Sequence, residues 1–179
     1  KVVKTMDLTE YAYILKLHTK NTGNVLNRIN GLSLNGTTWR NLLVDSLIGD
    51  EEAFARCLEV MESDPGCGFV YPYELGKKRS KGLPEDLSML EDEAARIGVD
   101  KLDGCFVAGT MFMARTEALS VIRDADISHE VFAVHKSRSH SRGSMAHVYE
   151  RLICFAMYQA GFVSKPVILS RSRAFKVFV

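Results

Sequence analysis

The sequence predicts a layered α/β domain, and two observations lead to this fold class. Short apolar segments with the character of buried strands alternate along the chain with segments whose apolar residues recur at helical spacing. The chain has 179 residues and is 46% hydrophobic, which is enough to build one sizeable core. Because domains mostly run to ~100–200 residues, we expect a single domain over residues 1–179.

The first half of the chain predicts a strand, a loop, two helices and a second strand. The first helix begins at Trp39 and is stopped by Gly49. Thr37 or Thr38 is expected to cap it, and Asp50 to cap the second helix. The predicted ranges are 11–17 for the first strand, 21–37 for the loop, 39–48 and 51–63 for the helices, and 68–71 for the second strand.

The second half predicts a basic loop, an acidic helix, a strand, a helix, an irregular segment, a long helix and two short strands. Gly109 interrupts the first of these strands, Thr116 caps the helix that follows it, and Gly161 closes the long helix. The predicted ranges are 74–82 for the loop, 84–97 for the acidic helix, 105–114 for the interrupted strand, 126–143 for the irregular segment, 144–159 for the long helix, and 166–169 and 174–179 for the last strands.

The overall charge and hydropathy exclude several classes of function. The net charge is +1, from 23 basic and 22 acidic residues, which gives no reason to expect nucleic acid as a partner. No apolar run approaches the ~20 residues that a membrane-spanning helix needs, and residues 1–4 are too short for a signal peptide. Since the chain starts without Met and inside patterned sequence, we expect a fragment of a longer protein.

The cysteines disfavour a zinc site. They are widely separated, lack any C-x-x-C pair, and each lies among apolar residues. We expect reduced, buried thiols in a cytoplasmic protein. The four are Cys57, Cys67, Cys105 and Cys154.

The most informative segment follows the first predicted strand, where His18, Thr19 and Lys20 come directly after the apolar run. Ligands of open α/β sheets bind at the carboxyl ends of strands, and an imidazole, a hydroxyl and an ammonium group suit a phosphate. His18 and Lys20 are two residues apart in an extended segment, so both can reach one phosphate group. The alternative is a solvent-facing strand end with incidental charges.

A second candidate is the glycine inside the apolar strand. A strand glycine marks a bulge or a close approach by another backbone or a ligand. Gly109, Thr110 and Met111 could form the floor of a sugar or acceptor pocket. The alternative is a glycine required only for packing under a helix.

A third candidate lies in the long helix, where His147, Glu150 and Arg151 can share one face. A glutamate beside a histidine and an arginine could act as the general base for an acceptor hydroxyl. The alternative is an ordinary surface network of polar side chains.

Two further segments are weaker candidates. Trp39 is expected to pack into the core at the start of its helix. Arg40 could face a phosphate near the same helix N-terminus. The basic run 135–142 could be a mobile loop over an anionic substrate, although a solvated loop is the simpler reading.

Taken together, these motifs resemble the rhamnan synthesis protein F family of bacterial glycosyltransferase-like proteins. The order and spacing of the motifs match over residues 11–162. The matching segments are Tyr13-Ile-Leu-Lys-Leu-His-Thr-Lys20, Trp39-Arg40 with Leu42-Leu43, Gly68-Phe-Val-Tyr-Pro72, Phe106-Val-Ala-Gly-Thr-Met-Phe-Met-Ala-Arg115 and Ala146-His-Val-Tyr-Glu-Arg151.

The resemblance implies a GT-A-like fold, a three-layer α/β sandwich around a mostly parallel sheet. His18-Thr19-Lys20 stands where such folds usually carry a metal-binding Asp-x-Asp motif, so the resemblance implies diphosphate binding by side chains, with Arg40 as a helper, and no metal or other cofactor. The family's upstream strand and Asn-x-Gly-Arg-Asp-like stretch have no counterpart before residue 11. The chain is therefore expected to hold only the C-terminal two-thirds of the domain.

The implied activity is transfer of a deoxyhexose, with rhamnose the expected sugar, from a nucleotide-sugar donor to a cell-surface polysaccharide or lipid-linked glycan. Glu150 would deprotonate the acceptor hydroxyl, oriented by His147 and Arg151, and Trp39 would join the acceptor pocket. The expected location is cytoplasmic, at the inner face of the bacterial membrane, with peripheral association through the rest of the protein. The alternative function is a non-catalytic carbohydrate-binding or scaffold module within a polysaccharide-synthesis protein.

Overall fold

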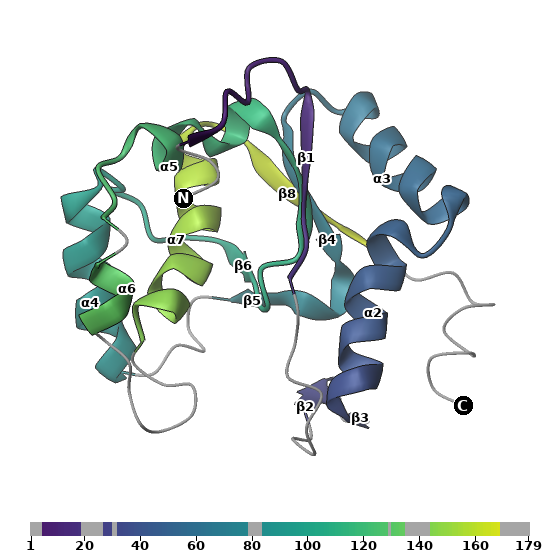
Figure 1. Ribbon diagram of the computed structural model, residues 1–179, viewed down its shortest axis with the longest axis horizontal. Coiled ribbons are helices and arrows are strands. Elements are labelled where there is room, and N and C mark those ends of the chain that lie inside the picture. The colour runs from purple at the N-terminus through teal and green to yellow at the C-terminus, as the bar shows by residue number, and fades with distance from the viewer. Residues whose placement is uncertain are drawn as a thin grey trace.

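A four-stranded sheet in the order β1-β7-β4-β8 forms the centre of the molecule (Figure 1). The computed structural model describes residues 5–18, 27–29, 32–78, 84–128, 130–134 and 144–168. The strands of the central sheet are β1 (Tyr13–Lys16), β4 (Cys67–Pro72), β7 (Phe112–Arg115) and β8 (Val163–Val167). The chain is thus a mixed α/β protein, as its sequence predicts.

The sheet is mixed, and the expected mostly parallel sheet is wrong. Of its three pairings in the described residues, β1–β7 and β4–β7 are antiparallel and β4–β8 is parallel. Three strands share one direction and β7 runs against them. Since Lys16 pairs with Phe112, the carboxyl end of β1 and the beginning of β7 lie side by side at one edge of the sheet.

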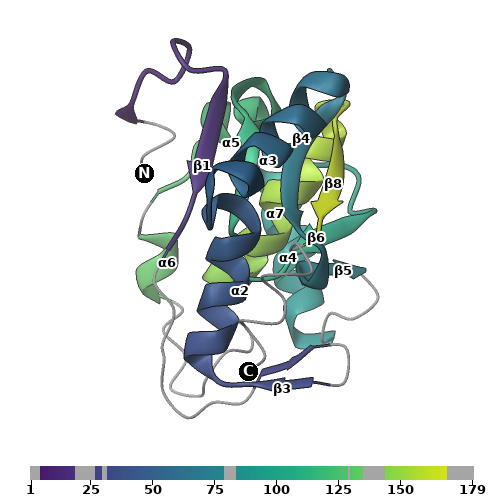
Figure 2. The same ribbon diagram turned by 90° about the vertical axis from the view of Figure 1, so that its right-hand side faces the viewer.

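Helices cover both faces of this sheet (Figures 1 and 2). On one face lie α2 (Gly36–Ile48) and α3 (Glu51–Ser63), which contact β4. On the other face lies α7 (Met145–Gln159), which contacts β8 and the neighbouring small sheet. The buried core between these layers draws Leu43 and Leu47 from α2, Cys57 and Met61 from α3, Phe69 and Phe112 from the sheet, and Cys154 and Met157 from α7.

Capping side chains fix where α2 and α3 begin. The Asp50 carboxylate accepts the Ala53 N–H at 2.7 Å, which confirms the cap predicted for the second helix. The first helix begins at Gly36, earlier than expected, because Asn35 rather than Thr37 or Thr38 is its N-cap. The Asn35 side chain accepts the Thr38 N–H at 2.8 Å.

A second apolar cluster lies on the far side of α7. It joins α7 to α4 (Pro84–Arg96), α5 (Ser120–Asp124) and α6 (Val131–Val134), and includes Leu90, Ile122, Val148, Leu152 and Phe155. Ile153 and Tyr158 of α7 pack against both clusters. The long helix is therefore the element that holds the two parts of the core together.

The apolar segment 105–114 is two strands rather than one interrupted strand. β6 (Cys105–Val107) pairs with β5 (Gly76–Lys78) in a two-stranded sheet, and the chain then turns and enters the central sheet as β7. The break falls at Gly109, where the sequence places it, but the glycine turns the chain from one sheet into another instead of making a bulge.

Other segments also differ from expectation, and the predicted loop 74–82 contains the strand β5. β2 (Asn27–Ile29) and β3 (Leu32–Leu34) pair as antiparallel strands inside the predicted loop 21–37. Thr116 begins the 3-10 turn η3 (Thr116–Leu119) instead of capping a helix. α6 lies within the segment 126–143, which was expected to be irregular. The final predicted strand, 174–179, the basic run 135–142 and residues 79–82 of the basic loop lie outside the described residues.

All four cysteines are free thiols; three are buried and Cys105 is half-buried. Burial raises the pKa of Cys57 to about 11 and that of Cys154 to about 12, which makes both poor nucleophiles at neutral pH. None of the helices in the described ranges has the length and apolar character needed to cross a bilayer.

Candidate functional site

Two residues with left-handed backbone form the turn between β6 and β7. Gly109 has φ +89° and Thr110 has φ +47°. Among the described residues, Thr110 is the only non-glycine with positive φ. This conformation is unfavourable for a β-branched side chain and costs about 1–3 kcal/mol, so it persists only where the surroundings impose it.

Three side chains hold this turn by its backbone. The His18 ring nitrogen Nε2 hydrogen-bonds the Gly109 carbonyl, and the Gly109 N–H donates to Glu150 Oε1. Lys16 Nζ donates to the Thr110 carbonyl at 2.8 Å. We call these five residues, Lys16, His18, Gly109, Thr110 and Glu150, the turn site. It brings together the end of β1, the Gly109 segment and the long helix, which are three of the segments that the sequence singled out.

The backbone around the turn is hydrogen-bonded on both sides. Thr110 N–H donates to the Val107 carbonyl at 3.1 Å, and Ala108 N–H donates to the Leu75 carbonyl at 2.9 Å. Val107 N–H lies 3.4 Å from the buried Cys154 Sγ on α7. The turn is therefore anchored to Leu75, which directly precedes β5, and to α7 as well as to β1.

Glu150 lies in the second turn of α7 and is half-buried. One oxygen of its carboxylate accepts the Gly109 N–H. The other oxygen, Oε2, has lone pairs that can accept a hydrogen bond from a hydroxyl group. A carboxylate with one oxygen fixed by a backbone N–H is one of the groups that can take part in general acid–base chemistry.

The two neighbours predicted to orient Glu150 make other contacts. His147 Nδ1 lies 2.7 Å from the Ser144 hydroxyl at the start of α7. Arg151 is 8% exposed; its guanidinium lies 5.1 Å from the Phe106 ring centroid, and Nη1 donates to the His147 carbonyl at 3.2 Å. The residue that the structure places against Glu150 is Gly109.

The remaining predicted site residues make none of the turn-site contacts or lie outside the described residues. Arg40 is exposed on α2, where its guanidinium donates to the Asn41 side chain at 2.8 and 3.2 Å. Trp39 is half-buried against the main core. Met111 is fully buried in that core, so its side chain faces no open surface. Thr19 and Lys20 belong to the part of the chain that is not described.

Sequence reasoning missed Lys16 as a site residue. Lys16 is the last residue of β1 and its side chain reaches across the pairing with β7 to the turn; Nζ also lies 6.0 Å from the Phe112 ring centroid. The signal was present in the sequence, because Lys16 is two residues before His18 and so shares its side of an extended segment.

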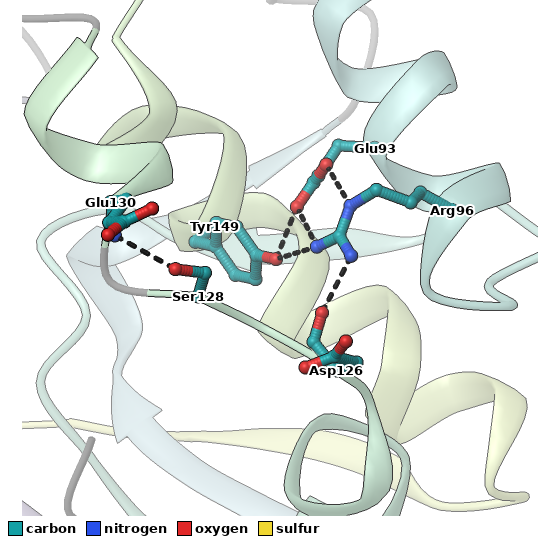
Figure 3. Close-up of polar contacts among 6 residues, drawn as sticks. All are labelled: Glu93, Arg96, Asp126, Ser128, Glu130 and Tyr149. Carbon is teal, nitrogen blue, oxygen red and sulfur yellow. Dashed lines mark hydrogen bonds and ion pairs between the residues drawn. The ribbon is translucent and has the colours of Figure 1, made fainter.

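Sequence reasoning also missed a polar network between α4 and α7, formed by Glu93, Arg96 and Tyr149 (Figure 3). Arg96 donates to both Glu93 oxygens, at 2.6 and 2.7 Å, and to the Asp126 carbonyl at 2.6 Å. The Tyr149 hydroxyl donates to Glu93 Oε1. We call Glu93, Arg96 and Tyr149 the helix network.

The helix network favours the ionised form of the buried Glu93 carboxylate. Glu93 is only 6% exposed, and the Arg96 guanidinium beside it holds the pKa of Glu93 below its ordinary value. Burial raises the pKa of the Tyr149 hydroxyl, and its hydrogen bond to ionised Glu93 raises that pKa further. Nearby, the Glu130 N–H donates to the Ser128 hydroxyl at 3.2 Å (Figure 3).

No three His, Cys, Asp or Glu side chains gather into a possible metal site in the described ranges. The chemistry that the turn site offers is that of a carboxylate, an imidazole and an ammonium group around a fixed backbone turn.

Comparison with known proteins places the chain in a family. It is 27% identical over 150 residues to the uncharacterized protein WxcX of Xanthomonas campestris pv. campestris, in each of two strains. The match covers 83% of this chain but only 20% of each relative, so the chain corresponds to one fifth of the curated proteins that it matches. No solved structure matches it. The model of the rhamnan synthesis protein F family matches residues 3–162, which include every described residue of the turn site, and the chain therefore belongs to that family.

Proposed function

We propose that this chain is a glycosyltransferase domain that moves a deoxyhexose, rhamnose, from a nucleotide-sugar donor to a cell-surface polysaccharide or lipid-linked glycan. Membership of the rhamnan synthesis protein F family supports a role in polysaccharide synthesis. A sheet covered by helices on both faces, with three of its four strands in one direction, supports a GT-A-like fold. The proposed location is the cytoplasmic face of the membrane, reached through the rest of the protein.

The observation that carries the proposal is the contact of Glu150 with the turn: one oxygen of its carboxylate accepts the Gly109 N–H. In the proposed reaction the acceptor hydroxyl gives its proton to Glu150 Oε2 as its oxygen bonds to the anomeric carbon of the donor sugar. The bond between that carbon and the diphosphate oxygen breaks, and the nucleoside diphosphate leaves with the electron pair. Gly109 N–H holds the other Glu150 oxygen in place.

Polar and basic side chains would stabilise the departing diphosphate. His18 lies beside the Gly109 carbonyl, and we propose that Thr19, Lys20 and Arg40 complete the site. Basic side chains can balance the growing negative charge of a leaving diphosphate without a metal. The backbone of Thr110 would border the sugar or acceptor.

Two variants at one position test the role of Glu150 in the full protein that contains this chain. Glu150→Gln keeps an oxygen that can accept the Gly109 N–H but cannot take a proton, whereas Glu150→Ala removes both functions. If Glu150 is the base, both variants lower the rate of transfer from nucleotide-activated rhamnose by about 10²–10⁴-fold, while Glu150→Gln binds the donor normally. Wild-type rates in Glu150→Gln would reject this assignment.

One observation favours a non-catalytic carbohydrate-binding module instead. The turn-site contacts described above all run from side chains to backbone, which a purely structural role would also explain. Calorimetric titration of the full protein separates the two functions. Binding of a nucleotide-sugar that is lost in His18→Ala supports the transferase, whereas binding of glycan without any binding of nucleotide-sugar supports the module.

A further inference from the structure

Lys16 makes the one turn-site contact that reaches Thr110. Its ammonium group donates to the Thr110 carbonyl at 2.8 Å, and Thr110 is held at φ +47°. A threonine adopts this conformation only when its surroundings hold it there, because its branched Cβ crowds the backbone. Lys16 supplies part of that constraint from the last position of β1.

The constraint extends to Glu150 through consecutive backbone atoms. Thr110 follows Gly109 directly, and the Gly109 N–H is the group that fixes Glu150 Oε1. If Thr110 relaxes to negative φ, the peptide group between Gly109 and Thr110 rotates, and the Gly109 carbonyl held by His18 rotates with it. The backbone of Gly109 and Thr110 thus links the Lys16 ammonium group to the Glu150 carboxylate.

We propose that Lys16 is a positioning residue: by holding Thr110 in the left-handed conformation, it sets the Gly109 N–H against Glu150 and so aligns the carboxylate for proton transfer. This inference rests on the proposed function. It differs from a phosphate-binding role, because Lys16 acts on the turn and its loss is expected to change turnover rather than donor affinity.

Kinetics of the full protein test this role. Lys16→Met keeps most of the apolar stem and removes the donor, and it is expected to lower kcat about tenfold with KM for the nucleotide-sugar within twofold of wild type. Lys16→Arg restores a donor and is expected to recover most of kcat. Lys165→Met is the matched control, because Lys165 is also a strand lysine and its 2.7 Å contact is with Asp64. Unchanged kcat in Lys16→Met, or a raised KM alone, would overturn the proposal.

The route through Thr110 is tested by comparing Lys16→Met in two backgrounds. Glycine adopts positive φ without steric cost, so Lys16→Met should lower kcat far less in a Thr110→Gly protein than in wild type. Thr110→Asn is the second background, since asparagine also tolerates this conformation. An equal loss of kcat in all backgrounds would show that Lys16 acts by another route.

Hydrogen exchange separates failure of this inference from failure of the proposed function. In peptides spanning 105–112, Lys16→Met is expected to speed amide exchange about tenfold in the wild-type background and far less beside Thr110→Gly. If the wild-type protein transfers no sugar, the proposed function and the kinetic role of Lys16 both fail. The exchange comparison then still decides whether Lys16 holds the turn, and equal exchange with and without Lys16 would reject that as well.

Discussion

The turn site and the helix network both depend on α7, yet they are built in opposite ways. Tyr149 and Glu150 are adjacent on this helix and point about 100° apart around its axis. Tyr149 joins a network of side chains that satisfy one another, with a buried carboxylate held between an arginine and a hydroxyl. Glu150 instead holds the backbone of a turn in which a threonine has an unfavourable conformation.

We expect the helix network to serve mainly stability and the turn site to serve mainly the proposed reaction. Satisfied buried polar groups make a structure rigid and are costly to break. An unfavourable backbone conformation that is maintained by side chains from other elements is typical of functional sites. Substitutions in the two regions should therefore affect stability and activity in opposite proportions.

The largest effect on stability is expected from Arg96→Met. This change leaves the Glu93 carboxylate buried without its main partner, and we expect a loss of about 3 kcal/mol in the free energy of unfolding. Exchange of core amides in α4 and α7 measures the loss. Arg56→Met is the control, since its contact with Glu52 is 3.4 Å long and Glu52 is largely exposed. A loss below about 1 kcal/mol would mean that the helix network is not a main source of stability.

Gly109→Ala is expected to cost about 1–2 kcal/mol, because an L-residue is strained at φ +89°. Gly161→Ala is a matched control: its φ is +88°, and a Cβ there would meet no atom within 4 Å. The two variants should lose similar stability, but only Gly109→Ala should reduce sugar transfer. Equal transfer rates in the two variants would remove the distinction between the regions.

Acid should weaken the helix network by a smaller amount. The folded-state pKa of Glu93 lies below its unfolded value of about 4.3, so its contribution is complete above that pH and is lost as pH falls through the folded pKa. The stability difference between wild type and Glu93→Gln should therefore shrink below about pH 4. Asp64→Asn is the control variant, because Asp64 also has a lowered pKa, which results from its ion pair with Lys165. A difference that stays constant with pH would contradict the role of the charge.

The smallest effect is expected from Thr110→Gly. Relief of the left-handed strain opposes the greater entropy of glycine in the unfolded chain, so stability should change by less than about 1 kcal/mol. Exchange of amides in β6 and β7 measures this change. A loss of several kcal/mol would mean that the threonine side chain, rather than its backbone, holds the turn.

The sequence predicted elements well where local chemistry decides them and poorly where distant partners do. The Asp50 cap follows from a single residue and is found, and the predicted interruption at Gly109 falls at the break between β6 and β7. The direction of β7 does not follow from its apolar residues, because a buried strand has the same pattern in parallel and antiparallel sheets. The β2–β3 pair was missed because three-residue strands among asparagines and glycines resemble a loop.

The candidate site was predicted in part for the same reason. His18, Gly109 and Glu150 were selected from separate motifs, and the fold brings them together. Their contacts with one another were not predictable, since 91 and 41 residues separate the partners in the sequence. The helix network was missed altogether, because Glu93 and Tyr149 are 56 residues apart and neither belongs to a recognisable motif.

The position of the Gly109–Thr110 turn between two sheets also bears on how this family can vary in length. Most surface loops accept insertions, because the elements on either side keep their places. An added residue here would shift β7 by one position relative to β1 and β4, and each side chain of the strand would move to the opposite face of the sheet. Phe112, whose ring stacks on Phe69 at 4.3 Å, would leave the core. We therefore expect natural relatives to differ in length at many loops but to keep the number of residues between β6 and β7.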